Sequence, residues 1–329
     1  MDVALYLDDA LGGYGYAEKP WFLPHERLAA YKAELDRRGL DHAALEARAH
    51  LYPAPLAADA DILRFHSPAH VDRVRALCTK DEGTPLDHGP TPARASVERA
   101  ATHVVGAVCD AARRISRGEV KRAFVPIAGF HHAHREEARN YCLYNDCAIV
   151  LSLLADTIAG PVASVDIDVH FGDGVYRAFA SDPRILAVDL HEDARSLFPN
   201  TKEKPSAEPG PGGVDWIGEG SARGTKLNAP LSAGSGDRDY LAAVGEMMAF
   251  LAARSPKVVV LQAGLDTLAG DPMANLAVSI DAYRSAITQT RALADRHADG
   301  KLLVLGGGGY RTEAVAVAWC AVTEELLKE

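Results

Sequence analysis

The chain has 329 residues, of which 48% are hydrophobic and 24% are charged, as is typical of a globular protein with a sizeable core. Its formal net charge of −10 argues against a nucleic-acid partner, because a phosphate backbone is bound by clustered Lys and Arg. The beginning of the sequence has no basic flank, and no apolar run approaches the about 20 residues that span a bilayer, so neither a secretory signal nor a membrane partner is expected.

The first third of the chain predicts mainly helices. Apolar and charged residues recur at helical spacing in four segments: Glu26 to Arg38, Ala43 to His50, Pro68 to Leu77 and Ala95 to Ser116. The segment from Gly83 to Pro92 is rich in Gly and Pro and predicts a loop.

The pattern then changes to short apolar segments separated by helical ones. The predicted strands are Ala123–Ile127, Val162–Ile167, Arg184–Leu190, Lys257–Leu261 and Lys301–Leu305. The predicted helices are Asp146–Ile158, Gly174–Ala180, Asp237–Arg254, Ser279–His297 and Thr312–Lys328. This alternation predicts an α/β protein with a parallel sheet covered on both faces. The segment from Pro199 to Gly236 is rich in Gly, Pro and Ser and predicts a long loop.

The cysteines indicate the compartment rather than the chemistry. They form no CxxC pair, so neither a disulfide framework nor a thiolate zinc site is indicated. Free thiols in a reducing compartment are expected, and therefore a cytoplasmic protein. The five residues are Cys78, Cys109, Cys142, Cys147 and Cys320.

Polar residues follow the predicted strands, and ligands bind at the carboxyl ends of strands in open parallel sheets. Asp168 and His170 are two residues apart, which in an extended strand places both side chains on one face. Asp266 follows another predicted strand and can supply a third ligand. Two carboxylates and one imidazole form a catalytic zinc set, although Fe(II), Co(II) or Mn(II) would also be accepted. The alternative is a buried Asp168–His170 salt bridge.

Two adjacent histidines, His131 and His132, follow the strand that ends at Ile127. A histidine beside a metal-bound water can act as general base and then as general acid. Each ring needs an orienting carboxylate, and Asp166 and Asp173 are the natural partners. The nearby His134 is expected to be a solvent-facing loop residue.

A run of four glycines ends at Tyr310. Such a turn lets the backbone approach closely, and a phenol at its end can donate a hydrogen bond to a developing oxyanion. His191 follows a further predicted strand and is expected to have a structural role.

Five segments in this order resemble the histone deacetylase family, whereas the residues before 120 match it only loosely. The segments are Ala128–Ala133, Tyr141–Asp146, Asp166–Gly174, Leu261–Asp266 and Leu305–Tyr310. The resemblance implies the arginase/deacetylase fold, with residues 1–329 as a single catalytic domain around a mostly parallel sheet of about eight strands flanked by helices.

The resemblance also implies an activity, its cofactors and its site. The activity is zinc-dependent hydrolysis of an acyl group from acylated lysine in a protein or peptide, with zinc held by Asp168, His170 and Asp266. Catalysis would use His131, His132, Asp166, Asp173 and Tyr310. Tyr141 and Phe198 would wall an acyl tunnel with Met273 near its rim. A structural potassium ion would lie near Asp166, Asp168, His170, Asp189 and Leu190.

The chain departs from the family pattern in three places. Phe171 replaces a second histidine that is not a zinc ligand. Asn140 and Tyr141 stand where glycine and phenylalanine are common, and Asp189 stands where serine is frequent. The Tyr141 hydroxyl could alter acyl preference, and Asp189 adds an anion near the expected potassium site.

Three alternatives stay open, as does the oligomeric state. The first is a deacetylase of small acylated amines such as acetylpolyamines, which would need a rim carboxylate for the distal ammonium; Met273 resembles the lysine-deacetylase pattern instead. The second is a binuclear manganese ureohydrolase of the arginase type, which needs additional bridging aspartates near Asp266. The third is a non-enzymatic module that binds an acyl ligand.

Overall fold

The computed structural model describes residues 1–16, 24–88, 91–199 and 211–328. Within these ranges the strands form one eight-stranded parallel sheet in the order β2-β1-β3-β8-β7-β4-β5-β6, which confirms the predicted fold class. The strands are β1 (Val3–Leu5), β2 (His50–Leu51), β3 (Arg122–Val125), β4 (Val162–Asp166), β5 (Ile185–Glu192), β6 (Lys226–Leu231), β7 (Val258–Gln262) and β8 (Leu302–Leu305).

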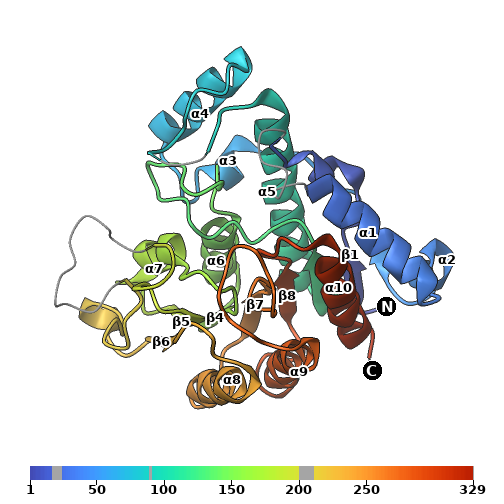
Figure 1. Cartoon of the computed structure of the whole chain (residues 1–329), viewed down its shortest axis with the longest axis vertical. Helices are drawn as coiled ribbons and strands as arrows, with labels where there is room; N and C mark the ends of the chain where they lie inside the picture. Colours follow the sequence, from blue (N-terminus) through green and yellow to red (C-terminus); the bar gives the residue numbers. More distant parts are fainter. Residues whose placement is uncertain (17–23, 89–90, 200–210, 329) are drawn as a thin grey trace.

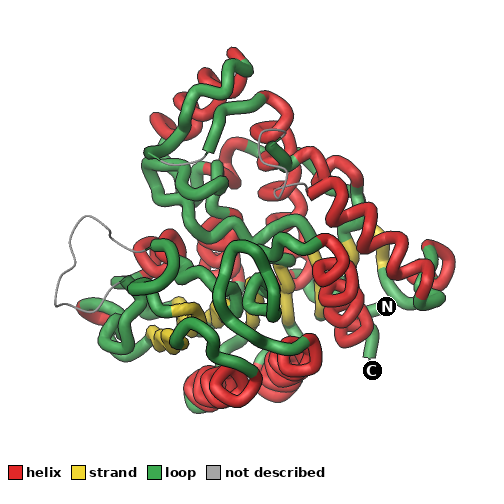
Figure 2. The backbone as a smooth tube through the Cα atoms, in the orientation of Figure 1, coloured by secondary structure: helices red, strands yellow, loops and turns green. Residues whose placement is uncertain are grey.

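Helices cover both faces of this sheet (Figure 1). On one face α5 and α6 pack on the central strands. On the other face α9 packs on β7, α10 packs on β3 and α8 packs on β5 and the edge strand β6, which makes three layers (Figure 2). The helices are α1 (Pro24–Arg37), α2 (His42–Glu46), α3 (Asp59–Ile62), α4 (Pro68–Lys80), α5 (Ala95–Ser116), α6 (Asp146–Thr157), α7 (Asp173–Phe179), α8 (Asp237–Ala252), α9 (Ile280–His297) and α10 (Thr312–Leu326), with two 3₁₀ turns, η1 (Asp9–Gly13) and η2 (Gly220–Ala222). Among the described helices, none has the length and apolarity needed to span a membrane.

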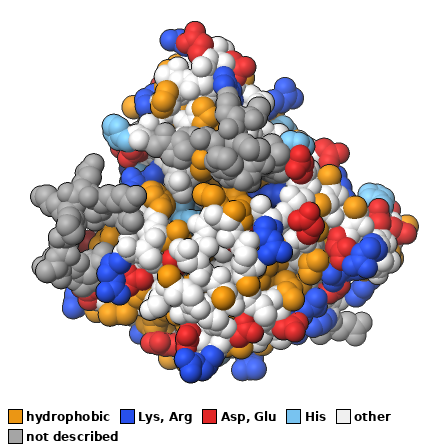
Figure 3. Space-filling model, in the orientation of Figure 1, with side chains coloured by type: hydrophobic (Ala, Val, Ile, Leu, Met, Phe, Trp, Pro, Cys, Tyr) orange, Lys and Arg blue, Asp and Glu red, His pale blue; other side chains and the backbone are white. Residues whose placement is uncertain are grey.

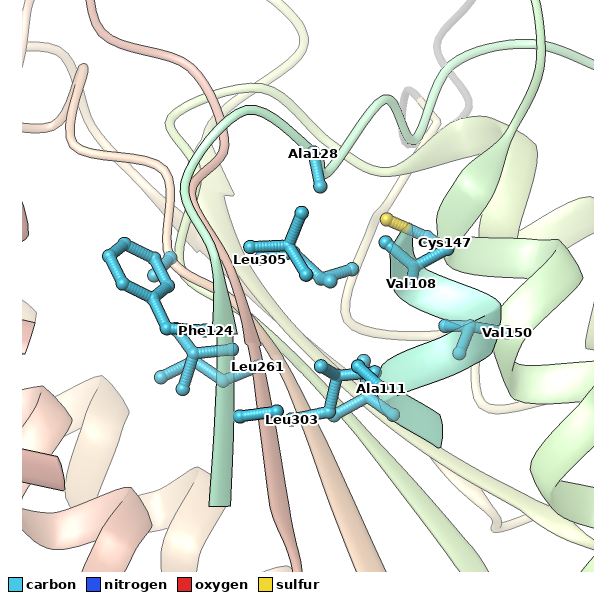
Figure 4. Close-up of a cluster of buried hydrophobic side chains, with 14 of the residues drawn as sticks. Val108, Ala111, Phe124, Ala128, Cys147, Val150, Leu261, Leu303 and Leu305 are labelled. Atoms are coloured by element: carbon cyan, nitrogen blue, oxygen red, sulfur yellow. The ribbon is translucent and has the colours of Figure 1, made fainter. Parts of the chain in front are cut away.

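The central strands are buried along their whole length, because both of their faces carry aliphatic side chains. Leu303 and Leu305 of β8 face Val108 and Ala111 of α5 (Figure 4). On the opposite side of the sheet, the ring of Phe124 in β3 lies 6.4 Å from the ring of Trp319 in α10. This aliphatic layer supports the ends of the strands, where the polar residues lie.

Three strands were not predicted: β1, β2 and β6. The first two have only three and two residues, too few for a period to show. The helix expected over Ala43 to His50 ends at Glu46, because His50 instead pairs with Ala4 of β1. The loop expected over Pro199 to Gly236 is wrong in part, since β6 pairs with β5 there; residues 200–210 of it lie outside the described residues.

Charged side chains of both signs are interspersed on the face of the molecule in Figure 3, and neither sign covers it. A surface of this kind has no continuous basic stripe with which to follow a phosphate backbone.

Candidate metal centre

Three side chains that can bind a metal converge beside the carboxyl ends of β4 and β7. Asp168 and His170 follow β4, Asp266 follows β7, and one ligand atom from each lies within 4.8 Å of the other two. They meet because β4 and β7 are neighbours in the sheet, although about a hundred residues separate them in the chain. The expected extended strand is wrong at this point: β4 ends at Asp166, and the loop after it carries both residues.

The spacing of these atoms fits a divalent ion. His170 Nδ1 lies 3.1 Å from Asp168 Oδ1 and 3.2 Å from Asp266 Oδ2. Tetrahedral zinc with bonds of about 2.0–2.1 Å sets its ligand atoms about 3.3 Å apart. Asp266 Oδ2 is also buried without a hydrogen-bond partner, which is costly for an anion unless a cation binds it.

Two glycines make room for this arrangement. A Cβ atom at Gly264 would lie 2.2 Å from Asp168 Oδ2, and a Cβ atom at Gly308 would lie 2.3 Å from Asp266 Oδ2. Any side chain at either position would therefore displace a carboxylate. The Gly308 N–H also donates a hydrogen bond of 3.0 Å to Asp168 Oδ2, so the glycine-rich turn fixes the position of this carboxylate.

The adjacent histidines each have a carboxylate partner. His131 Nδ1 lies 2.8 Å from Asp166 Oδ2, and His132 Nδ1 lies 2.8 Å from Asp173 Oδ1. The two Nε2 atoms are 3.2 Å apart, and both rings line the same cavity as Asp168 and His170. The structure thus brings together the histidines and the partners expected for them.

Their surroundings drive the pKa values of the two rings apart. Burial lowers the pKa of His131, but the carboxylates of Asp166 and Asp168 outweigh it and raise the pKa to about 10. Burial and then the neighbouring His131 lower the pKa of His132 to about 4. In the protein's own field His131 therefore carries the charge, and His132 is neutral and able to accept a proton.

The Asp173 carboxylate serves more than His132. Its Oδ2 lies 3.1 Å from His134 Nε2 and 2.9 Å from Arg139 Nε. Burial raises the pKa of Asp173, but its histidine and arginine neighbours hold it well below its usual range. The expectation that His134 faces solvent is wrong, because this pairing half-buries it.

Tyr310 lines the same cavity at the end of the glycine run. Its backbone N–H donates a hydrogen bond of 2.8 Å to Asp271 Oδ2, which anchors the turn. Burial, with Asp266 and Asp168 adding to it, raises the pKa of the phenol well above its usual value. Tyr310 therefore keeps its proton and can act as a hydrogen-bond donor.

The cavity is narrow, with a volume of about 40 Å³, and Tyr141 forms part of its wall. The Phe198 ring lies edge-on to the His132 ring at 5.0 Å. Met273 is half-buried, and its N–H donates to Asp271 Oδ1. A larger groove of about 460 Å³ lies elsewhere, beside α1 and α2, but its mainly aliphatic lining lacks a converging set of metal ligands.

The loops that carry Phe198 and Met273 are joined by a buried carboxylate. Glu192 Oε1 accepts hydrogen bonds from Ser196 Oγ and Asn275 Nδ2, each at 2.8 Å. Glu192 Oε2 accepts from the Asn275 N–H at 3.0 Å. These contacts connect the segment before Phe198 to the segment after Met273.

Some residues of the site were not singled out from the sequence. The Arg27 guanidinium lies at the inner end of the cavity and donates 2.9 Å to the Gly307 carbonyl. Gln262 Nε2 donates 2.9 Å to Asp168 Oδ2, and Asn145 Nδ2 donates 3.0 Å to the His131 carbonyl. Asn145 and Gln262 carried a signal, because each lies in a segment that resembles the family.

The expected potassium region has its own pairing. Asp189 faces Asp166 on the neighbouring strand. Asp189 Oδ2 accepts from the Gly172 N–H at 3.0 Å, and Asp189 Oδ1 lies 2.7 Å from His191 Nδ1. His191 is fully buried, as a structural residue would be, and Leu190 is buried beside it.

Comparison with known proteins gives a consistent result. The family described as "Histone deacetylase domain" matches residues 23–326. A histone deacetylase-like amidohydrolase of Pseudomonas aeruginosa is 30% identical over 316 residues, 95% of this chain and 79% of the relative. The acetoin utilization protein AcuC of Bacillus subtilis is 29% identical over 279 residues, 82% of this chain and 70% of the relative.

Two solved structures share the fold over nearly the whole chain. The crystal structure of the HDA15 HD domain has a TM-score of 0.85 and 27% identity, and the match covers 99% of this chain and 89% of that one. The crystal structure of an HDAC homolog complexed with SAHA has a TM-score of 0.83 and 25% identity, over 99% of this chain and 84% of that one.

Proposed function

Because this chain belongs to the histone deacetylase family, we propose that it is a zinc-dependent amidohydrolase that removes an acyl group from acylated lysine in a protein or peptide. We take residues 1–329 as one catalytic domain. The observation that carries the proposal is the convergence of Asp168, His170 and Asp266, two of which line a cavity together with a histidine pair and a tyrosine.

Zinc would be held by Asp168 Oδ1, His170 Nδ1 and Asp266 Oδ2, the atoms whose spacing fits it. When bound, the ion supplies a water of lowered pKa and polarises the amide carbonyl. The remaining chemistry falls to the protein's own side chains, which orient the substrate and move its protons.

His132 is the proposed general base and then the general acid. Its Nδ1 is held by Asp173, and its Nε2, which lies 3.2 Å from His131 Nε2, is the atom that we assign to take the proton of the attacking water. The same nitrogen then returns a proton to the departing amine. His131, paired with Asp166, carries positive charge beside it and disfavours a second charge on His132, so the proton is readily released.

Tyr310 and Arg27 are assigned to the two ends of the acyl group. The phenol O–H donates to the carbonyl oxygen as it becomes an oxyanion. Arg27, which is buried, lines the cavity and donates a hydrogen bond to the Gly307 carbonyl, provides a cation for the carboxylate product. Tyr141 and Phe198 form the walls along which the apolar part of the substrate passes.

Two further assignments accompany this proposal. A structural potassium ion beside Asp166, Asp168, His170, Asp189 and Leu190 would offset the two carboxylates that face each other on neighbouring strands. A cytoplasmic location is supported by the cysteines, all five of which are free and buried.

The decisive experiment is a substrate panel run with and without chelator. Acetyl-lysine peptides and longer acyl-lysine peptides are compared with acetylspermidine, the probe for the alternative function on small acylated amines. Hydrolysis of the peptides that stops with chelator and returns with zinc supports the proposal. Turnover of acetylspermidine alone would support the alternative, and a binuclear metal content would indicate arginase-type chemistry instead.

A further inference from the structure

A short hairpin beside the histidine pair carries one wall of the cavity. The backbone of Arg139 and Cys142 is paired in both directions, with N···O distances of 2.9 Å. Between them, Asn140 and Tyr141 have φ values of 43° and 68°. Positive φ at both central residues is typical of type I′ turns, in which the flanking residues sit opposite one another. The turn therefore fixes the Arg139 backbone relative to the Tyr141 wall.

The side chain of Arg139 reaches back from this hairpin to the carboxylate behind His132. Its Nε lies 2.9 Å from Asp173 Oδ2 without making a hydrogen bond, so the contact is an ion pair. The Asp173 side chain is only 5% exposed, whereas that of Arg139 is 31% exposed. Water screens such a half-buried pair less than a surface pair, so its attraction retains more strength.

Arg139 also contacts Phe198, the residue proposed as the second wall of the acyl tunnel. Its guanidinium carbon lies 5.3 Å from the centre of the Phe198 ring, within the range of a cation–π contact. Phe198 in turn lies edge-on to His132. One side chain thus contacts the carboxylate that orients His132 and the ring that packs on His132, while its backbone begins the Tyr141 turn.

We propose that Arg139 is a positioning residue for the hydrolytic reaction: it fixes the Asp173 carboxylate behind His132 and holds the Phe198 and Tyr141 walls at a set separation. The inference rests on the proposed function for its chemical meaning. Arg139 does not touch the reacting atoms, and it acts through Asp173. His134 Nε2 lies 3.1 Å from the same Asp173 oxygen, but an imidazole lacks the guanidinium fork with which Arg139 reaches both Asp173 and Phe198.

The test uses the full chain loaded with zinc and an acetyl-lysine peptide. Loss of a residue that orients a catalytic group typically costs about 10–100-fold, so Arg139→Ala should lower kcat by that factor. KM should change by less than about threefold, because the residue orients His132 rather than the substrate. Arg139→Lys should retain part of kcat, and added guanidine should restore part of it to the alanine variant. Arg195→Ala is the matched control: Arg195 lies in the loop before Phe198 and pairs with Asp193 instead.

A second measurement does not depend on turnover. In the metal-free protein, the ring N–H proton of His132 that bonds to Asp173 should be visible by NMR and protected from exchange. In Arg139→Ala this proton should exchange faster, and in Arg195→Ala it should not. If the wild-type protein hydrolyses no acyl substrate, the proposed function fails while this measurement still tests the role of Arg139.

Three results would overturn the inference. The first is a kcat of Arg139→Ala equal to that of Arg195→Ala, with His132 exchange unchanged. The second is a rise in KM that accounts for the whole loss, because that would place Arg139 in substrate binding alone. The third applies if the alanine variant folds poorly: Arg139→Gln, which keeps most of the volume without the charge, would then show the wild-type kcat.

Discussion

The central strands of the sheet and the loops that follow them are built in opposite ways, although only a few residues separate them. Within β7 and β8 every side chain is buried, and nearly all are aliphatic. Just beyond these strands lie Asp266 and Tyr310, and Tyr310 lines a cavity together with two histidines that each have a carboxylate partner. The strands supply stability through apolar burial, whereas the loops hold like charges close together at a cost that a bound cation would offset.

The contrast means that a change in the loops should affect chemistry more than folding, and a change in the strands should do the reverse. The metal ligands provide the strongest test. Asp266→Asn keeps the shape and removes the negative charge of a carboxylate whose Oδ2 is buried without a hydrogen-bond partner. Hydrolysis should fall by about 10³-fold or more and zinc should no longer be retained, while the metal-free protein melts at the same or a higher temperature. Metal analysis measures the zinc content, and calorimetry measures the melting temperature. A large drop in melting temperature would contradict the view that the loops contribute to chemistry rather than to folding.

Tyr310 gives the next largest effect. Tyr310→Phe removes only a hydroxyl, so kcat should fall by about 10²–10³-fold, as on loss of one oxyanion donor. Zinc content should stay unchanged, because the ring is not among the metal ligands. Kinetics on the peptide, with metal content as the control, measures this outcome. Unchanged turnover would remove Tyr310 from the mechanism.

The aliphatic layer should show the reverse behaviour. Leu303 is fully buried in β8, so Leu303→Ala should lower the free energy of unfolding by about 2–5 kcal/mol. Folded enzyme at low temperature should keep its kcat within a few-fold, because Leu303 lies well inside the strand. Denaturant titration combined with kinetics on the same sample would reveal whether the strand substitution changes stability without changing catalysis. A catalytic loss that matches the metal-ligand variants would show that they are not.

Asn145 bonds both to a helix and to the loop of the histidine pair, so its substitution should affect stability and catalysis together, each by a small amount. Its Oδ1 accepts from the Ala148 N–H at the start of α6, and its Nδ2 bonds the carbonyls of His131 and Ala133. Asn145→Ala should cost about 1–2 kcal/mol of stability through the lost helix cap. It should also reduce kcat, because the histidine segment loses its support. If only stability falls, Asn145 serves as a helix cap alone; if only kcat falls, it supports the histidine segment alone.

Much of the sheet could be predicted because its interior strands are long and continuously apolar. β6 escaped prediction because its buried residues, Lys226 and Asn228, are polar, its other residues are half-buried, and the surrounding segment is rich in Gly and Pro. The individual residues of the site were recognisable from their types and spacing. Their meeting was not, because it depends on β7 lying next to β4, and strand order is a property of the whole packed domain.

The same limit explains the partners of Asp173. His134 and Arg139 form no motif with it, and their approach depends on how a hairpin folds back onto the start of α7. Long-range pairs of this kind carry no periodic signal in the sequence. They are visible only when the backbone has been placed.

The buried Glu192 has a consequence for anyone who wishes to redesign acyl-chain selectivity. Its carboxylate bonds to both the loop of Phe198 and the loop of Met273, the residues proposed to border the acyl tunnel. A substitution at either residue alone therefore leaves the other loop held in place. Glu192→Gln would keep the volume and weaken the fastening, so it is the starting point for a library that admits bulkier acyl groups.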